Sequence, residues 1–200
     1  RAESEFTFTN CVFENNSAVN NGGACFFDDD SWVILNNCDF LSNYARLSGG
    51  AVSCDESEIV FENNCTFTGN SSDRLGGALY FDDSSLTIDS CEFQNNSANT
   101  GGAVVASSTF INIENCSLSG NSAIDGGAIC LRYSNAEFND NQFDGNTAIG
   151  EEYTDLFGHR YLGGHGGAIF SDYSQGFFSS CSFNNNQALS VIDSDSDRRI

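Results

Sequence analysis

The chain has 200 residues, of which 40% are hydrophobic, and it carries a formal net charge of −21 at pH 7. This length and apolar content are enough for one domain with its own core. The charge repels nucleic acid phosphates and anionic bilayers, and no apolar run approaches the ~20 residues that cross a bilayer. We therefore expect neither nucleic acid binding nor membrane insertion.

One template recurs seven times along the chain. The first copy reads Cys11-Val-Phe-Glu-Asn-Asn16, with a Phe two positions after the Cys and an Asn three positions after the Phe. The copies start near residues 11, 38, 65, 91, 116, 141 and 181. In six copies a Gly-Gly-Ala follows, beginning at Gly22, Gly49, Gly76, Gly101, Gly126 and Gly166. Successive copies are 25–27 residues apart, except that the last follows after 40.

Each repeat contains three short segments that alternate with a period of two, which is typical of strands. They are the Cys-x-Phe segment, the segment after Gly-Gly-Ala, and a third with apolar residues two apart, such as Val33 and Leu35. A unit of this size cannot bury its apolar face alone, so the units must stack ~4.8 Å apart. We predict an all-β fold, a right-handed single-stranded parallel β-helix of six to seven coils, as a single domain over residues 1–200.

Stacking predicts ladders of equivalent side chains. An aromatic stack in the core would consist of Phe13, Phe40, Phe67, Phe93, Leu118, Phe143 and Phe183. The Asn that closes each copy, from Asn16 to Asn186, predicts a second ladder at a turn, where amides bond to one another or to backbone groups. The Gly-Gly pair supplies the positive-φ freedom of the next turn. A helical solenoid is excluded because no ten-residue stretch holds a 3.6-residue period.

The paired motif resembles a known family. Gly-Gly-Ala-[Ile/Leu/Val] together with Phe-x-x-Asn is similar to the repeat of the chlamydial polymorphic outer-membrane proteins, and the likeness to their β-helical passenger region runs from about Phe6 to Ala188. The resemblance implies surface display and adhesion. The 200 residues do not include the C-terminal membrane barrel of that family, and we expect them to be a mature chain or a piece of a longer one.

Five cysteines occupy one column in consecutive coils: Cys11, Cys38, Cys65, Cys91 and Cys116. A Cα separation of ~4.8 Å lies within the disulfide range of about 4.4–6.8 Å, so neighbouring coils can be joined covalently. The alternative is that each Cys is a small apolar spacer in the core. Nine cysteines without a CxxC pair favour an oxidising compartment.

Asn-x-Ser/Thr triplets mark five candidate glycosylation sites: Asn15, Asn64, Asn70, Asn95 and Asn115. Asn15 and Asn95 fall at the same outward turn position and are good acceptors if the source is eukaryotic. Asn70 belongs to the predicted ladder and is the weakest.

Carboxylates cluster at one turn in three successive coils, with Asp28, Asp30, Asp55, Asp82 and Asp83 as the candidate ligands. A Ca²⁺ ion would relieve the repulsion between stacked carboxylates. The alternative is a solvated acidic face, and no cofactor is required in either case.

Residues 149–165 form the one long insertion. They include Tyr153, Phe157, His159, Arg160 and Tyr161, which are residue types enriched at protein contacts. Insertions in solenoids fall in loops on one face, often the binding face. We expect an interaction loop here, or else a loop that packs against the side of the coil.

A structural function is favoured over catalysis. Although β-helices host polysaccharide lyases and hydrolases, the chain has no Lys, and Arg46, Arg74 and Arg132 share no carboxylate set. The repeat stops near an acidic tail at residues 191–200, so each end of the coil presents strands that a neighbouring copy can cover.

We therefore predict a non-enzymatic extracellular or cell-surface protein that assembles with copies of itself, head to tail or laterally, into a filament or appendage. Glycans are a further class of partner. The alternative is an adhesin fragment that binds host or carbohydrate surfaces. A polysaccharide-acting enzyme is the third hypothesis.

Overall fold

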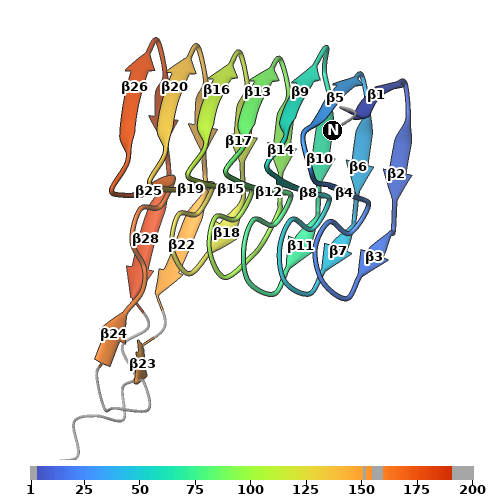
Figure 1. The fold of residues 1–200 in the computed structure, drawn as a ribbon. Helices are drawn as coiled ribbons and strands as arrows, with labels where there is room; N and C mark the ends of the chain where they lie inside the picture. The colour runs from blue at the N-terminus through green and yellow to red at the C-terminus, as the bar shows by residue number, and fades with distance from the viewer. Residues whose placement is uncertain (1–3, 151, 155–159, 191–200) are drawn as a thin grey trace, which may run out of the picture.

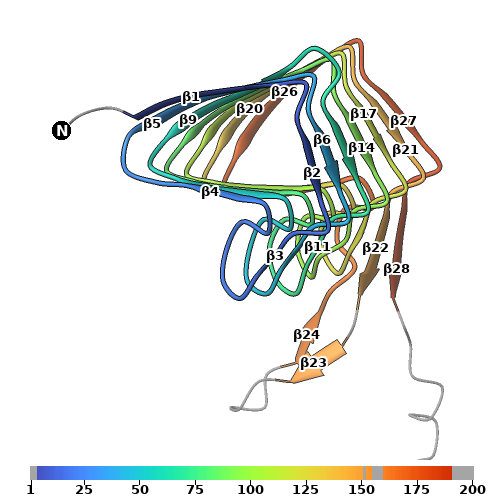
Figure 2. The same cartoon turned by 90° about the vertical axis from the view of Figure 1, so that its right-hand side faces the viewer.

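The computed structural model describes residues 4–150, 152–154 and 160–190, and all regular structure in these ranges is β-strand. The chain winds as a coil, and equivalent strands of successive coils pair in parallel (Figure 1). Viewed nearly along the stack, the coil encloses a three-sided core, and short loops project from one side (Figure 2). The predicted parallel β-helix is confirmed.

The first sheet has seven strands, and their order in the sheet is their order in successive coils. Residues two apart face inward, so that Ile59 and Phe61 are fully buried while Val60 between them faces outward. The strands are β1 (Ser4–Thr9), β5 (Ser31–Asn36), β9 (Glu58–Glu62), β13 (Ser85–Asp89), β16 (Phe110–Glu114), β20 (Asn135–Asn139) and β26 (Gln175–Ser179).

The second sheet also has seven strands and consists of the Cys-x-Phe segments. The middle residue of each strand is Phe, or Leu118 in the fifth strand, and it faces the core, whereas the outer residues are mostly polar. The strands are β2 (Val12–Glu14), β6 (Asp39–Leu41), β10 (Thr66–Thr68), β14 (Glu92–Gln94), β17 (Ser117–Ser119), β21 (Gln142–Asp144) and β27 (Ser182–Asn184).

The third sheet follows Gly-Gly-Ala and has six strands. They are β4 (Cys25–Phe27), β8 (Val52–Asp55), β12 (Leu79–Asp82), β15 (Val104–Ser107), β19 (Ile129–Arg132) and β25 (Ile169–Asp172). All three predicted strand segments are therefore present in the first six repeats.

Between the second and third sheets the chain forms the projecting loops, which have short parallel pairings of their own. Their strands are β3 (Ser17–Ala18), β7 (Tyr44–Ala45), β11 (Ser71–Ser72), β18 (Ser122–Ala123), β22 (Thr147–Gly150) and β28 (Gln187–Ser190). The insertion continues this side as an antiparallel hairpin of β23 (Glu152–Thr154) and β24 (Arg160–Leu162).

The corners explain the richness in Asn, Asp, Ser and Gly. Each corner uses a residue in the left-handed region, such as Asn10 at φ 55°, Asn15 at φ 55° and Glu56 at φ 46°. Asn, Asp and Gly adopt this conformation at the least steric cost. The first Gly of each Gly-Gly pair also has positive φ, as predicted, with Gly22 at 63°. The second Gly does not, and it is required because an added Cβ would meet backbone atoms of the neighbouring coil.

The predicted aromatic stack is confirmed. Ring centroids are 4.7 Å apart for Phe13 and Phe40, 4.8 Å for Phe40 and Phe67, and 4.5 Å for Phe67 and Phe93, with nearly parallel planes. Leu118 interrupts the rings in the predicted place. The rings follow the spacing of the strands, because one side chain per coil faces the same interior column.

The Asn ladder is also confirmed, and it is buried. Asn43, Asn70, Asn96, Asn121 and Asn146 are all fully inaccessible to solvent. In each step the backbone N–H and the side-chain N–H₂ of one Asn donate to the Oδ1 of the next, at 2.9–3.1 Å from Asn70 to Asn96. The same side chain also donates to a backbone carbonyl of the preceding coil. The column therefore satisfies polar backbone at a corner that water does not reach.

Candidate interaction surfaces

The first coil presents an aromatic end face. Phe6 is 45% exposed, and its ring packs against those of Phe8 and Phe27, with centroids 6.4 and 6.0 Å away. Phe8 in turn contacts Phe13 edge to face at 5.7 Å. These side chains belong to the inward columns of the three sheets, so the end face is a cross-section of the core.

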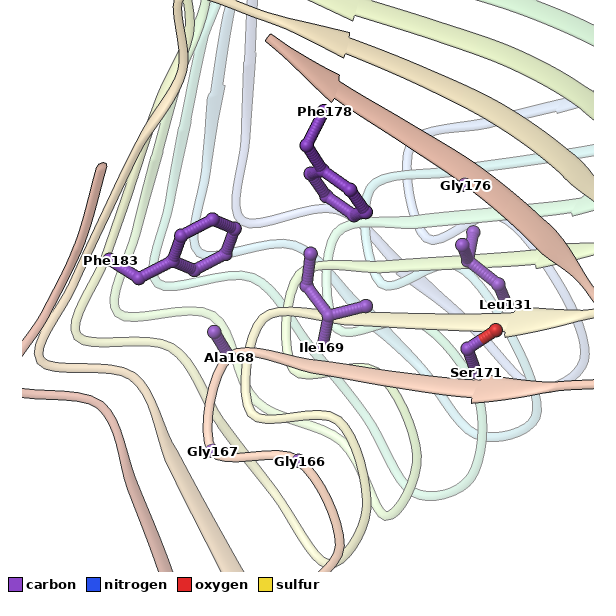
Figure 3. A pocket seen from close by; sticks show the side chains of 9 residues that line it. All are labelled: Leu131, Gly166, Gly167, Ala168, Ile169, Ser171, Gly176, Phe178 and Phe183. Atoms are coloured by element: carbon purple, nitrogen blue, oxygen red, sulfur yellow. The ribbon is translucent and has the colours of Figure 1, made fainter. Parts of the chain in front are cut away.

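The last described coil presents the opposite end face, and this one is hollow. A cavity of about 540 Å³ opens there, and Figure 3 shows the side chains that line it. Phe178 and Phe183 form one wall and are 47% and 48% exposed. Gly176 and Ser171 contribute little or no side chain to it. The lining is apolar apart from Ser171 and backbone groups: Leu131, Gly166, Gly167, Ala168, Ile169, Ser171, Gly176, Phe178 and Phe183.

The insertion that the sequence singled out forms a hairpin beside the projecting loops. Tyr153 lies opposite Tyr161, and Arg160 lies opposite Thr154, across its antiparallel pair. Phe157 and His159 lie outside the described residues. The chain rejoins the coil at His165, whose Nδ1 lies 2.8 Å from Asp125 Oδ1 while its backbone N–H donates to the same oxygen at 3.0 Å. This contact fixes the return point of the insertion.

The acidic turn is a ladder of like charges. Asp55 lies directly opposite Asp82 in the third sheet. Burial raises the pKa of the Asp55 carboxyl above its usual value, and the neighbouring carboxylates Asp82, Asp28 and Asp83 raise it further. Within the described residues no group of three or more acidic, His or Cys side chains is gathered so that it could hold an ion. The candidate Ca²⁺ ligands Asp28, Asp30, Asp55, Asp82 and Asp83 are therefore not gathered in such a group.

This repulsion has a measurable consequence. Asp55→Asn is expected to raise the free energy of unfolding at neutral pH by on the order of 0.5 kcal/mol, because directly opposed like charges destabilise a sheet. The gain should disappear below about pH 4, where the carboxyl of the wild type becomes neutral in both states. Urea unfolding of the wild type and the variant, at neutral pH and below about pH 4, measures this gain in stability. Glu137→Gln is the matched control, since Glu137 lies between Asn112 and Phe177 and has no opposing carboxylate; an equal gain there would contradict the assignment.

All nine cysteines are free thiols, so the disulfides between coils that the spacing allows are not formed in this structure. The column itself is confirmed, with Cys38, Cys65, Cys91 and Cys116 buried in the core. Hydrogen bonds to Cys116 and Cys65, together with burial, raise the pKa of Cys91. The hydrogen bond between Cys65 and Cys91 lowers the pKa of Cys65. The pattern is that of inward apolar spacers which also bond to neighbouring groups.

Cysteines in the other columns have raised pKa values. Burial raises the pKa of the Cys25, Cys54 and Cys130 thiols to about 11. Thiolate is the reactive form, so these groups are poor nucleophiles at neutral pH.

The five glycosylation candidates divide by burial. Asn15, Asn64, Asn95 and Asn115 are exposed at corners and have positive φ. Asn70 is fully buried, and its side chain bonds to Phe40 O and Asn96 Oδ1. Because a buried amide cannot accept a glycan, Asn70 is a wrong candidate, and membership of the ladder is the reason.

Two features were not found from the sequence. The first is a ladder of hydroxyls at the corner before the first sheet, where the backbone N–H of Ser31 donates to Ser57 Oγ at 3.0 Å and that of Ser134 donates to Ser174 Oγ at 3.0 Å. The sequence contains a sign of this ladder, because a Ser or Thr recurs just before each segment equivalent to the one that contains Val33. The second is an exposed pair of stacked rings, Tyr133 and Tyr173, with centroids 5.3 Å apart.

The stack of parallel coils has a counterpart among known proteins. The family model described as a right-handed beta helix region matches residues 1–199. The chain belongs to this family. The match establishes the right-handed β-helix without distinguishing among the groups of proteins that share it. Comparisons of this β-helix protein with curated proteins and with solved structures found no significant match. In the part of the chain that the structure describes, no helix is long and apolar enough to cross a membrane.

Proposed function

We propose that this β-helix protein is a non-enzymatic structural subunit, located at the cell surface or outside the cell, that assembles with copies of itself. The observation that carries the proposal is the uncovered apolar cross-section at both ends of the described coil, where Phe6, Phe178 and Phe183 are each nearly half exposed. Exposed apolar surface next to unpaired strand edges is a site for association with another chain.

The surroundings of the cavity favour a structural role over catalysis. Its lining consists of glycines, aliphatic and aromatic residues and one hydroxyl, Ser171. Acid–base catalysis requires titratable side chains that converge on a substrate. An apolar hollow of this kind suits an apolar side chain better than a saccharide.

Two sequence features support the proposed location. Four exposed Asn-x-Ser/Thr acceptors lie at corners of the coil, as expected of a secreted glycoprotein. The paired Gly-Gly-Ala and Phe-x-x-Asn motifs resemble those of the chlamydial polymorphic outer-membrane proteins, and that resemblance also favours surface display.

Assembly should strengthen with salt. Each copy carries a formal charge of −21, so copies repel one another at long range. Raising the ionic strength from ~0.01 M to ~0.15 M shortens the Debye length from about 30 Å to about 8 Å and removes most of that repulsion. Sedimentation velocity over a concentration series, with electron microscopy of the same samples, should show larger species at the higher salt. A chain that stays monomeric at both salt concentrations overturns the proposed function.

A further inference from the structure

The residues of the two end faces occupy the same columns of the coil, so that one end face can be placed on the other in register. An end-to-end contact in this register goes beyond self-assembly in general and rests on the proposed function. Each inward column can be followed from the first coil to the last through the paired strands. A second copy placed on the last coil in the same register would therefore bring a known residue over each residue of the hollow end face.

Most columns begin and end with the same chemistry. Phe13 and Phe183 belong to one aromatic column, and its last two rings, Phe143 and Phe183, stack at 4.7 Å. The Asn ladder starts at Asn16 and reaches Asn186 through a step of 3.0 Å. The first ring of a second copy would thus extend the aromatic stack, and Oδ1 of its Asn16 would be placed to accept from the backbone N–H of Asn186.

Two columns instead begin with a large residue and end with a small one. One column reads Phe6, Val33, Ile59, Leu86, Ile111, Ala136 and Gly176. The other reads Phe27, Cys54, Phe81, Ala106, Leu131 and Ser171. The aromatic ends of both columns touch each other in the first coil, since Phe6 and Phe27 are 6.0 Å apart. Their small ends line the same hollow in the last coil, as Figure 3 shows for Gly176 and Ser171.

We propose that the hollow end face binds the aromatic end face of a second copy, head to tail and in the register of the coil, with Phe6 of the second copy entering the hollow over Gly176. The knob and the hollow are complementary in size and both are apolar, so their contact buries surface that each end exposes alone. The parallel strands β26 and β1 then pair across the junction as β20 and β26 pair within one copy.

Charge favours this contact over a lateral one. The inward residues of both end coils are uncharged in the described part of the chain, where the acidic side chains lie at outward positions and corners. A side-by-side contact brings many of those carboxylates together, whereas the end-to-end register opposes one such pair in the three sheets, Asp28 of the second copy and Asp172, which follow Phe27 and Ser171. The hairpin of β23 and β24 lies on the loop side, clear of the three sheets in Figure 2.

Three substitutions separate the end contact from other modes of assembly. Phe6→Ala removes the knob, and Gly176→Leu fills the hollow, where an added Cβ meets only the far edge of the Phe178 ring at 3.1 Å. Each should raise the concentration needed for assembly about tenfold or more, which corresponds to about 1.4 kcal/mol per contact. Phe110→Ala is the matched control, because Phe110 is 50% exposed on the side of the first sheet. It should leave assembly unchanged.

Native thiols report the register directly. Cys181 and Cys11 are the partly exposed ends of the Cys column, and Cys181 lies above Asn141 rather than above another thiol. In the proposed register Cys11 of a second copy lies over Cys181 at ~4.8 Å between Cα atoms, within the disulfide range. In a Cys38→Ser background, which removes the competing thiol above Cys11, diamide should take two electrons and two protons from this pair. Mass spectrometry should then find a Cys11–Cys181 disulfide between copies.

The outcomes are distinguishable. Assembly that persists unchanged in Phe6→Ala and Gly176→Leu, without a Cys11–Cys181 disulfide, overturns the end-to-end contact but leaves self-assembly intact. A wild-type chain that never assembles overturns both. If assembly appears only after residues 191–200 are removed, the chain's own C-terminal residues occupy the hollow and the inference fails for the full chain.

Discussion

Asn96→Ala should lower the free energy of unfolding by roughly 3–5 kcal/mol, because the side chain it removes makes four buried hydrogen bonds. Asn96 Oδ1 accepts from the backbone N–H of Asn70 at 2.9 Å and from its side chain at 3.1 Å. Asn96 Nδ2 donates to Phe67 O at 2.9 Å and to Asn121 Oδ1 at 3.0 Å. Alanine leaves the Asn70 N–H without this acceptor in a place that water does not reach.

The measurement is the urea midpoint of unfolding, with Asn99→Ala as the control. Asn99 belongs to the same coil but is exposed, so the same substitution there should cost within about 0.5 kcal/mol. If the two variants lose equal stability, the ladder does not stabilise the coil in the way its geometry indicates.

Gly102→Ala should prevent the native coil or cost more than about 4 kcal/mol, a loss reserved for severe steric or polar defects. A Cβ on Gly102 would lie 2.1 Å from Gly127 O and 2.6 Å from Ser122 N. Both atoms are backbone, held by the strand pairing of the next coil, so neither can move aside. Gly102 has no positive φ, so the lack of room for a side chain is the reason that glycine is required at this position.

Gly145→Ala is the informative control. Gly145 has φ +64° and nothing within 4 Å of an added Cβ. It should cost only the left-handed conformation, about 1–2 kcal/mol. Circular dichroism and urea unfolding of the two variants should separate the effects, and equal losses would contradict close approach as the reason for the second Gly of the pair.

The repeated pattern in the sequence was sufficient to predict the coil. A Phe, a Cys and an Asn at fixed offsets, repeated every 25–27 residues, predicted the three strands, the aromatic stack and the Asn ladder, and the structure confirms each. Periodicity succeeds here because equivalent residues of successive coils are direct neighbours, so a repeat in sequence is a contact in space. The candidate sites were predicted less well. Asn70 was eliminated by burial, and the carboxylates do not converge on an ion.

By itself, then, the sequence determined the columns of this β-helix protein: which residues face inward and which residue lies above which. Only the tertiary structure decided what the columns do together. The hollow depends on Gly176 from the first sheet, Ser171 from the third and Phe183 from the second, which lie beside one another only because the chain closes into a three-sided coil. Whether the core of a coil is filled or hollow depends on the combined volume of the inward side chains from all three sheets. The residues of a single column do not give that combined volume.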